Sequence, residues 1–277
     1  MSDQRAKAER LRELHRGGKI LVLVNAWDGV SARIVEQLGY PAVASTSAGV
    51  AWTEGFADGE EIGREEMLAR VSVMARAVSV PVSADLEGGY GPSVADAEAT
   101  AHGAIDAGAV GLNFEDADAK SVGDLLDAGR QAERVAAIRR VGLDRGVPLV
   151  INARTDCFLA GIGSDDRYRL EESVRRSNLY LAAGADCAFV PGVSDEPTIA
   201  ELVSRINGPV NILASAAAPS LARLEQVGVA RVSLGSGSIG FALAKLRELA
   251  SGLQSSGGFE RLKERLSHAE LNALFNR

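Results

Sequence analysis

The chain has 277 residues, of which 46% are hydrophobic and 24% charged, a composition typical of a globular protein with a large core. Its net charge of −7 and the lack of a dense Lys/Arg stripe argue against a nucleic-acid partner. The apolar runs are too short to cross a bilayer, the charged N-terminus lacks the apolar core of a signal peptide, and there are only two cysteines. We therefore expect a cytoplasmic protein with no membrane partner and no disulfide framework.

One pattern repeats along the chain: a helix-like segment ends in Gly, and a short apolar, β-branched run follows. The Gly suits the left-handed residue that ends a helix, and the run suits a strand buried on both faces. The strands predicted in this way are Leu21–Asn25, Ala42–Thr46, Val82–Asp85, Gly111–Glu115, Leu149–Ala153, Cys187–Val190, Val210–Ala214 and Arg231–Leu234. The helices predicted between them include Arg64–Val78, Val94–Ala107, Arg130–Val141, Arg167–Ala183, Pro197–Ile206 and Ser220–Val227.

Alternating strands and helices of this number, over roughly 250 residues, predict an α/β protein with a closed (β/α)8 TIM-type barrel. An open doubly wound sheet would usually carry a Gly-rich fingerprint after an early strand, and none is present. We assign residues 1–250 to the barrel and residues 251–277 to an extra C-terminal segment. In that segment a Gly/Ser hinge over 251–258 precedes one or two short helices over Phe259–Asn276. The segment either folds back on its own barrel or packs on a neighbouring subunit.

Carboxylates gather after the third and fourth predicted strands, where the active sites of such barrels lie. Asp85 and Glu87 are two residues apart and face the same side of an extended chain, while Glu115 ends the adjacent strand. Three converging carboxylates repel one another unless a cation or a proton relieves them, and Mg²⁺ prefers oxygen ligands. The residues therefore predict a Mg²⁺ site at Asp85, Glu87 and Glu115. The alternative is that they are solvated loop acids or helix caps.

Other strand ends carry groups suited to an anionic substrate. Arg154 ends an apolar run and would offer a fork of donors to a carboxylate or a phosphonate, unless it pairs with Asp156 or Glu115. Thr46 and Ser47 offer hydroxyls and backbone N–H groups that suit an anion. The predicted substrate-binding residues are Trp27, Asp28, Thr46, Ser47 and Arg154.

Two long polar loops follow the second and fourth predicted strands. The first, Ser47–Ile62, contains Asp58, and the second, Asp116–Gly123, contains Lys120. Such loops over a barrel mouth often close as lids that exclude water, and the alternative is surface decoration.

These motifs together resemble the isocitrate lyase/phosphoenolpyruvate mutase superfamily, over about residues 20–240. The segment SADLEGGYG, residues 83–91, is similar to the family's Asp-Ala-Asp-Thr-Gly-[Tyr/Phe]-Gly metal motif, with Asp85 retained and Glu87 in place of its third carboxylate. The segment NFED, residues 113–116, is similar to the family's Ile-Glu-Asp. Arg154 matches the substrate-binding arginine, the Thr46-Ser47 pair matches the substrate-anion turn, and Asp58 matches an acid near the metal.

The resemblance implies a homodimer or homotetramer whose C-terminal helix is exchanged between subunits. It also implies Mg²⁺ or Mn²⁺ holding a small 2-oxo or 2-hydroxy carboxylate, and C–C or P–C bond chemistry through an enolate-like intermediate. The catalytic residues that it suggests are Asp58, which carries a proton unless a metal-bound water does so, Lys120, closing over the substrate, and Arg154, orienting an anionic end.

The loop after the fourth strand departs from the family pattern. Isocitrate and methylisocitrate lyases carry Lys-Lys/Arg-Cys-Gly-His there, whereas this chain has DADAKSVG, without Cys or His. Phosphoenolpyruvate mutases have a Lys and an Asn in this loop; Lys120 matches the Lys, and no Asn is found. Our leading hypothesis is a Mg²⁺-dependent lyase or decarboxylase that cleaves a C–C bond. The alternatives are a P–C bond mutase or hydrolase acting on a phosphonopyruvate-like compound, and a carboxylate-binding barrel without turnover.

Overall fold

The computed structural model describes residues 2–16, 18–118 and 123–276. Its strands are all parallel and form one sheet in the order β1-β9-β8-β7-β6-β5-β4-β3-β2. The predicted first strand is interrupted at Val24, and its two halves pair with β9 and β3, so that the sheet nearly closes into a barrel. The strands are β1 (Leu21–Leu23), β2 (Asn25–Ala26), β3 (Val43–Ser45), β4 (Val82–Asp85), β5 (Gly111–Glu115), β6 (Val150–Arg154), β7 (Cys187–Phe189), β8 (Val210–Leu213) and β9 (Arg231–Ser233).

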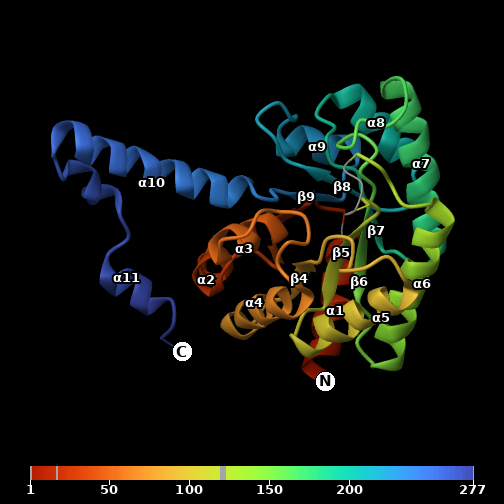
Figure 1. Ribbon diagram of the computed structural model, residues 1–277, viewed down its shortest axis with the longest axis horizontal. Helices are drawn as coiled ribbons and strands as arrows, with labels where there is room; N and C mark the ends of the chain where they lie inside the picture. Colours follow the sequence, from red (N-terminus) through yellow and green to blue (C-terminus); the bar gives the residue numbers. More distant parts are fainter. Residues whose placement is uncertain (1, 17, 119–122, 277) are drawn as a thin grey trace.

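Helices alternate with the strands and surround the sheet, which confirms the predicted (β/α)8 TIM-type barrel (Figure 1). Helix α1 lies at the N-terminal ends of the strands, because Gln4 and Arg12 donate to backbone carbonyls just before β5 and β6. The helices are α1 (Ser2–Leu14), α2 (Gly29–Gln37), α3 (Ser47–Glu54), α4 (Arg64–Ala77), α5 (Val94–Asp106), α6 (Ala128–Asp144), α7 (Asp166–Ala182), α8 (Glu196–Arg205), α9 (Leu221–Val227), α10 (Gly237–Ser256), the 3₁₀ helix η1 (Glu260–Glu264) and α11 (His268–Ala273). Among the described residues no helix is both long and apolar enough to span a bilayer.

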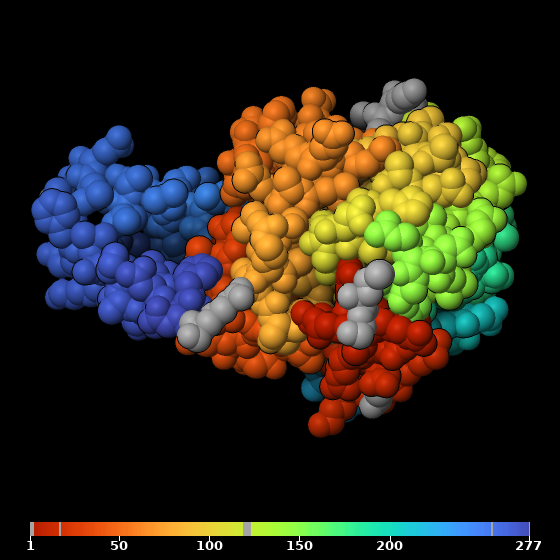
Figure 2. Space-filling view, turned by 90° about the horizontal axis from the view of Figure 1, so that it is seen from below, coloured from red at the N-terminus to blue at the C-terminus, as the bar shows by residue number. Residues whose placement is uncertain are grey.

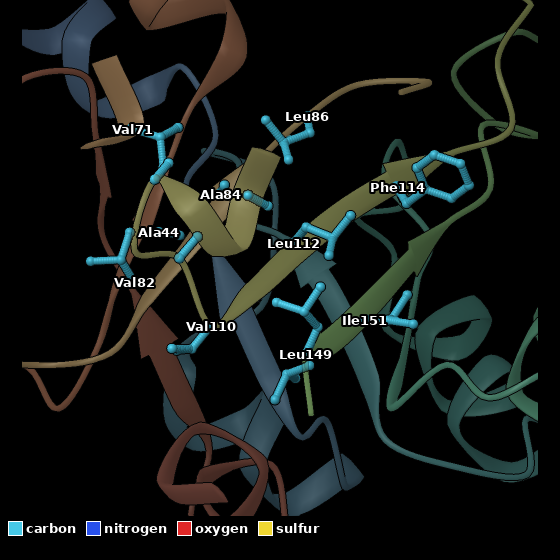
Figure 3. Close-up of a cluster of buried hydrophobic side chains, with 14 of the residues drawn as sticks. Ala44, Val71, Val82, Ala84, Leu86, Val110, Leu112, Phe114, Leu149 and Ile151 are labelled. Atoms are coloured by element: carbon cyan, nitrogen blue, oxygen red, sulfur yellow. The ribbon is translucent and has the colours of Figure 1, made fainter. Parts of the chain in front are cut away.

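The core separates into two layers because side chains alternate along each strand. Leu112 and Phe114 of β5 belong to the buried hydrophobic cluster shown in Figure 3, together with residues of β3, β4, β6 and α4. The alternate residue, Asn113, lies in the barrel interior and accepts a hydrogen bond from Nδ2 of Asn152 at 2.7 Å. The barrel interior is therefore polar beneath its mouth.

The predicted loop Ser47–Ile62 is wrong in its first half, because Ser47–Glu54 forms helix α3. Thr46 caps the start of this helix, and Gly55 ends it in the left-handed conformation with φ +86°. Only the remaining residues, from Phe56 to Ile62, form a loop over the barrel mouth.

The C-terminal segment forms an arm, α10 to α11, that stands away from the barrel (Figures 1 and 2). The predicted hinge over 251–258 is wrong for its first six residues, since α10 continues to Ser256 and ends only at the left-handed Gly257. A Gly inside a helix costs only about 1 kcal/mol and need not end it. The predicted helices over Phe259–Asn276 are confirmed as η1 and α11. The arm returns to its own barrel at Leu274, whose carbonyl accepts a hydrogen bond from Arg33 at 2.6 Å.

Candidate active site

A cavity of about 190 Å³ opens at the C-terminal ends of the strands. It brings together five of the predicted site residues: Thr46, Ser47, Asp58, Asp85 and Arg154. These side chains come from the ends of β3, β4 and β6 and from the loop after α3. The location is the one expected for the active site of such a barrel.

Asp85 is a buried carboxylate held by three donors. The backbone N–H and the hydroxyl of Ser47 each lie 3.0 Å from its Oδ2 atom, and Nδ2 of Asn113 lies 3.2 Å from Oδ1. Ser47 is the first residue of α3, so Asp85 also lies at the positive end of that helix. The N–H and hydroxyl of Ser47, predicted to hold a substrate anion, therefore bind a carboxylate of the protein itself. Thr46 is buried beside them, and its hydroxyl accepts a hydrogen bond from Gly49 at 3.4 Å.

Glu87 follows Asp85 by two residues and has an unusual backbone conformation, with φ +49°. Its Oε2 atom accepts a hydrogen bond from the backbone of Glu60 at 2.6 Å. Its Oε1 atom is buried and has no hydrogen-bond partner among the described residues. Burial, followed by the charges of Asp58 and Asp85, raises the pKa of Glu87 to about 8. Such an orphaned oxygen is costly unless a proton or a cation binds it.

Asp58 belongs to the loop after α3 and is exposed at the rim of the cavity. Partial desolvation by the surrounding protein, followed by the charge of Asp85, raises the pKa of the Asp58 carboxyl above its ordinary value. The charge of Arg154 opposes this shift. Asp58 therefore holds a proton to higher pH than a free aspartate does.

The segment Glu87–Gly91, which we call the carboxylate loop, is clamped by a buried arginine of α6. One amino group of Arg134 donates to the carbonyls of Gly88 and Gly91, the latter at 2.7 Å, and the guanidinium stacks 4.6 Å from the centroid of the Phe114 ring. Gly89 has φ +90°, and a Cβ atom there would lie 2.6 Å from the same ring. The loop can approach Arg134 and Phe114 this closely only with glycine at that position.

Arg154 is held between two carboxylates. Its Nη1 lies 2.7 Å from Glu115, and its Nε and Nη2 lie 2.5 and 2.8 Å from the two oxygens of Asp156. Burial opposes its charge, but Glu115 and Asp156 outweigh burial and raise its pKa. Asp116 supports this arrangement by accepting the backbone N–H of Asp156 at 3.0 Å, and Gln131 by donating to the carbonyl of Glu115 at 2.8 Å. Both pairing alternatives considered for Arg154 are thus present.

The chemistry of this donor set fits a divalent cation at Asp85 and Glu87. Their oxygens are the hard ligands that Mg²⁺ prefers, Asp58 adds further negative charge, and Oε1 of Glu87 lacks a partner in the described structure. Over the described ranges, no three His, Cys, Asp or Glu side chains are grouped closely enough to form a complete ligand set. A cation would therefore keep several waters, as Mg²⁺ commonly does. Glu115 pairs with Arg154 here, and its role as a ligand stays a prediction.

A model of the family described as phosphoenolpyruvate phosphomutase matches residues 11–254. The chain belongs to this family. The predicted resemblance to the isocitrate lyase/phosphoenolpyruvate mutase superfamily is thus confirmed.

Some of the proteins similar to this chain are named as lyases and others as mutases. A solved structure of a Burkholderia cenocepacia protein, described as a candidate phosphonomutase, is 38% identical with a TM-score of 0.85, over 92% of this chain and 100% of that chain. The 2-methylisocitrate lyase of Bacillus subtilis is 27% identical over 77% of this chain and 68% of its own length. The structure of a phosphonopyruvate hydrolase with oxalate and Mg²⁺ is 24% identical with a TM-score of 0.84, over 97% and 94% of the two chains, and shows the same fold.

Among the predicted site residues, Glu87 and Glu115 lie beside the cavity without lining it, near Asp85 and Arg154 respectively. Three others lie elsewhere or outside the described residues. Asp28 does not line the cavity, because its carboxylate caps α2 by accepting the N–H and hydroxyl of Ser31, each at 2.7 Å. Trp27 does not line it either, and packs against Gly49 of α3, where a Cβ atom would lie 3.1 Å from the Cβ atom of Trp27. Lys120 lies outside the described residues, so its predicted role stays a prediction.

The sequence analysis assigns no role to several residues that the structure places in or beside the site. Asn113 lies two positions before Glu115, so the alternation of strand side chains already indicates that it faces the barrel interior. Phe189 ends β7 as Arg154 ends β6, and the same rule finds it. Arg134 and Glu60 lie in the middle of a helix and of a loop, and nothing in the sequence pattern distinguishes them from surface charges.

Proposed function

We propose that this protein is a Mg²⁺-dependent lyase that cleaves a C–C bond in a small 2-oxo or 2-hydroxy carboxylate. The observation that carries the proposal is the group Asp58, Asp85 and Glu87 at the barrel mouth, with an orphaned carboxylate oxygen and raised pKa values beside Arg154. Names of lyases and mutases within the superfamily support an enzymatic role.

Asp85 and Glu87 would hold the cation, together with waters. When bound, the cation would act as a Lewis acid and stabilise negative charge on the oxygen next to the substrate carboxylate. Arg154 donates one N–H to Glu115 and two to Asp156, so two of its five N–H groups could bind the substrate carboxylate. Asp58, at the rim of the cavity, would take the proton of a substrate hydroxyl as the C–C bond breaks. The electron pair of that bond would pass to a carbon of the second fragment that lies next to a carbonyl or carboxylate group, and the proton taken up by Asp58 would then be delivered to this carbon.

The balance of charge favours C–C over P–C chemistry. During its transfer a phosphoryl group carries negative charge spread over several oxygens, and several cationic groups usually stabilise this charge. Among the described residues that line the cavity, Arg154 is the one cationic side chain, and two carboxylates already share it. A P–C bond mutase or hydrolase is the second candidate, because the 38% identical structure is described as a candidate phosphonomutase.

Product analysis tests the proposal. Purified protein with Mg²⁺ is incubated with oxaloacetate, alkylmalates, methylisocitrate and phosphonopyruvate, and products are followed by proton and phosphorus NMR. We expect a 2-oxo acid or an aldehyde from a carbon acid, lost with EDTA and in Asp85→Asn. Turnover of phosphonopyruvate alone would favour the second candidate, and ligand binding without any turnover would favour a silent carboxylate-binding barrel.

We further propose that the arm α10 to α11 packs on a second copy of the chain, in a homodimer or homotetramer. The arm carries several large apolar side chains on its surface. Among them, Phe241, Leu246 and Phe259 are 60–70% exposed. A surface of this kind on an arm standing away from the barrel usually marks a protein interface.

A further inference from the structure

Three residues with a strained backbone lie together beside the candidate cation site. Glu60, Glu87 and Tyr90 have φ values of +62°, +49° and +59°, and no other non-glycine residue of the described chain has a positive φ. Side chains other than glycine rarely adopt this conformation, and it persists only where surrounding contacts enforce it. Glu60 belongs to the loop over residues 56–62, which we call the Asp58 loop. Glu87 and Tyr90 belong to the carboxylate loop, so the strain is concentrated where these two loops meet.

Two hydrogen bonds join the loops, and Glu60 makes both of them. Its backbone N–H donates to Oε2 of Glu87 at 2.6 Å, and its Oε1 atom accepts the backbone N–H of Tyr90 at 2.7 Å. The same Oε1 atom lies over Gly88, where a Cβ atom would approach it to 3.2 Å. One residue therefore fixes the Asp58 loop on the carboxylate loop through both its backbone and its side chain.

The two carboxylate oxygens of Glu87 have different surroundings. Among the described residues, the Glu60 N–H is the one hydrogen-bond donor to this carboxylate, and it binds Oε2. The other oxygen, Oε1, is buried and has no partner in the described chain. A cation bound to Oε1 would leave the contact with Glu60 intact. Glu87 would then join the cation on one side and the Asp58 loop on the other.

The contact at Glu60 lies close to the residue that reaches the cavity. Asp58, two positions earlier, lines the cavity, and residues 56–59 are all exposed. The chain becomes buried again only at Ile62. Glu60 is therefore the contact with the carboxylate loop that lies nearest to Asp58 along the chain.

From these contacts we propose that Glu60 is a positioning residue that holds Glu87 for the cation and Asp58 at the cavity at the same time. The inference rests on the proposed function, because that function places the cation at Glu87 and the proton carrier at Asp58. It adds a coupling between them: binding of the cation orders the Asp58 loop, and the ordered loop strengthens binding by the same factor. Glu60 acts through its hydrogen bonds rather than its charge, since Tyr90 engages its carboxylate.

Mn²⁺ titration of the full chain and four variants tests the proposal. Glu60→Ala and Glu60→Gly both remove the carboxylate, and glycine adopts a positive φ without strain, so the pair separates the side chain from the backbone. Glu60→Gln removes the charge but keeps an oxygen that can accept the N–H of Tyr90. Glu61→Ala, at the exposed glutamate next in the loop, is the matched control for loss of a charge. We expect Glu60→Ala and Glu60→Gly to raise the dissociation constant at least about tenfold, and the other two variants to stay within about threefold of wild type.

Hydrogen exchange gives a second measurement that does not depend on turnover. The peptide that spans residues 56–62 is followed by mass spectrometry with and without Mg²⁺. We expect Mg²⁺ to slow its exchange in wild type and in Glu60→Gln, and to leave the exchange unchanged in Glu60→Ala.

The outcomes distinguish the inference from the function on which it rests. Mn²⁺ affinity in Glu60→Ala and Glu60→Gly equal to that of wild type would overturn the role of Glu60 alone, as would Mg²⁺ binding that leaves exchange of the wild-type loop unchanged. Equal weakening by Glu60→Gln and Glu60→Ala would also overturn it, because the charge would then be the cause. Weakening by Glu60→Ala without weakening by Glu60→Gly would overturn it in favour of backbone strain. No Mn²⁺ binding by the wild type would overturn the proposed cation site and this inference together.

Discussion

Arg134 should determine how firmly the carboxylate loop presents Glu87 to a cation. The substitution Arg134→Lys keeps the positive charge but replaces a planar fork with a single ammonium group, which cannot reach Gly88, Gly91 and Gln131 together. A lost hydrogen bond from a charged donor to a buried carbonyl costs about 1–3 kcal/mol. Residues that orient metal ligands typically change metal affinity by about 10- to 100-fold when altered. We expect the dissociation constant for Mn²⁺ to rise at least tenfold.

A second arginine on the same helix provides the control for this prediction. Arg139 also donates to buried backbone carbonyls, those of Leu149 and Gly184, but at the N-terminal ends of the strands. Arg139→Lys should therefore lower stability to a similar degree and leave Mn²⁺ affinity within twofold. Free Mn²⁺ is measured by electron paramagnetic resonance during titration, and stability by urea unfolding. Equal Mn²⁺ affinity in wild type and Arg134→Lys, or equal weakening by both variants, would refute the positioning role of Arg134.

Three further predictions concern stability and assembly. Burial, with Arg231 adding to it, lowers the pKa of His15 from 6.5 to about 4, so the unfolded chain binds more protons between these values. The contribution of His15 to the free energy of unfolding should then fall by about 3 kcal/mol as pH drops from about 6.5 to about 4, measured in urea titrations as the difference between wild type and His15→Gln, and a difference that does not change with pH would contradict it. Gly89→Ala should cost at least about 2 kcal/mol in the same assay, because of its φ of +90° and the 2.6 Å approach to Phe114, and an unchanged midpoint would contradict the clamp geometry. Phe241→Arg combined with Leu246→Arg should shift the protein to a monomer in analytical ultracentrifugation if the arm packs on a second copy, and an unchanged sedimentation coefficient would argue against that interface.

The sequence predicts the barrel well because the alternation of strands and helices is determined by residues that are close together in the chain. Several strands are short apolar runs that follow a helix ending in Gly, such as those beginning at Gly111 and Cys187, and these runs start where the structure starts them. The run beginning at Val82 also starts where β4 does, although Pro81 precedes it. Arg154 and Asp85 follow from the same rule, since the ends of parallel strands meet at one face of the barrel. Both the fold and the position of the mouth therefore depend on patterns within a few residues of each strand.

What the sequence does not predict depends on contacts between distant segments. Arg134 belongs to the site because its helix lies beside the carboxylate loop, 43 positions away along the chain from Gly91. Asp28 follows a strand as the other site residues do, yet Ser31 draws it into a helix cap. The sequence pattern places the hinge too early, because Gly252 lies inside α10, whereas Gly257 adopts the left-handed conformation that ends the helix.

The central claim is that a divalent cation binds at Asp85 and Glu87 in the barrel mouth. The most direct measurement is equilibrium Mn²⁺ binding to wild type and to Asp85→Asn, a substitution of equal size that removes one ligand charge. We predict one Mn²⁺ per chain in the wild type, displaced by Mg²⁺, and an affinity at least 100-fold lower in Asp85→Asn with the urea midpoint retained. Equal Mn²⁺ affinity in the two proteins would contradict the claim.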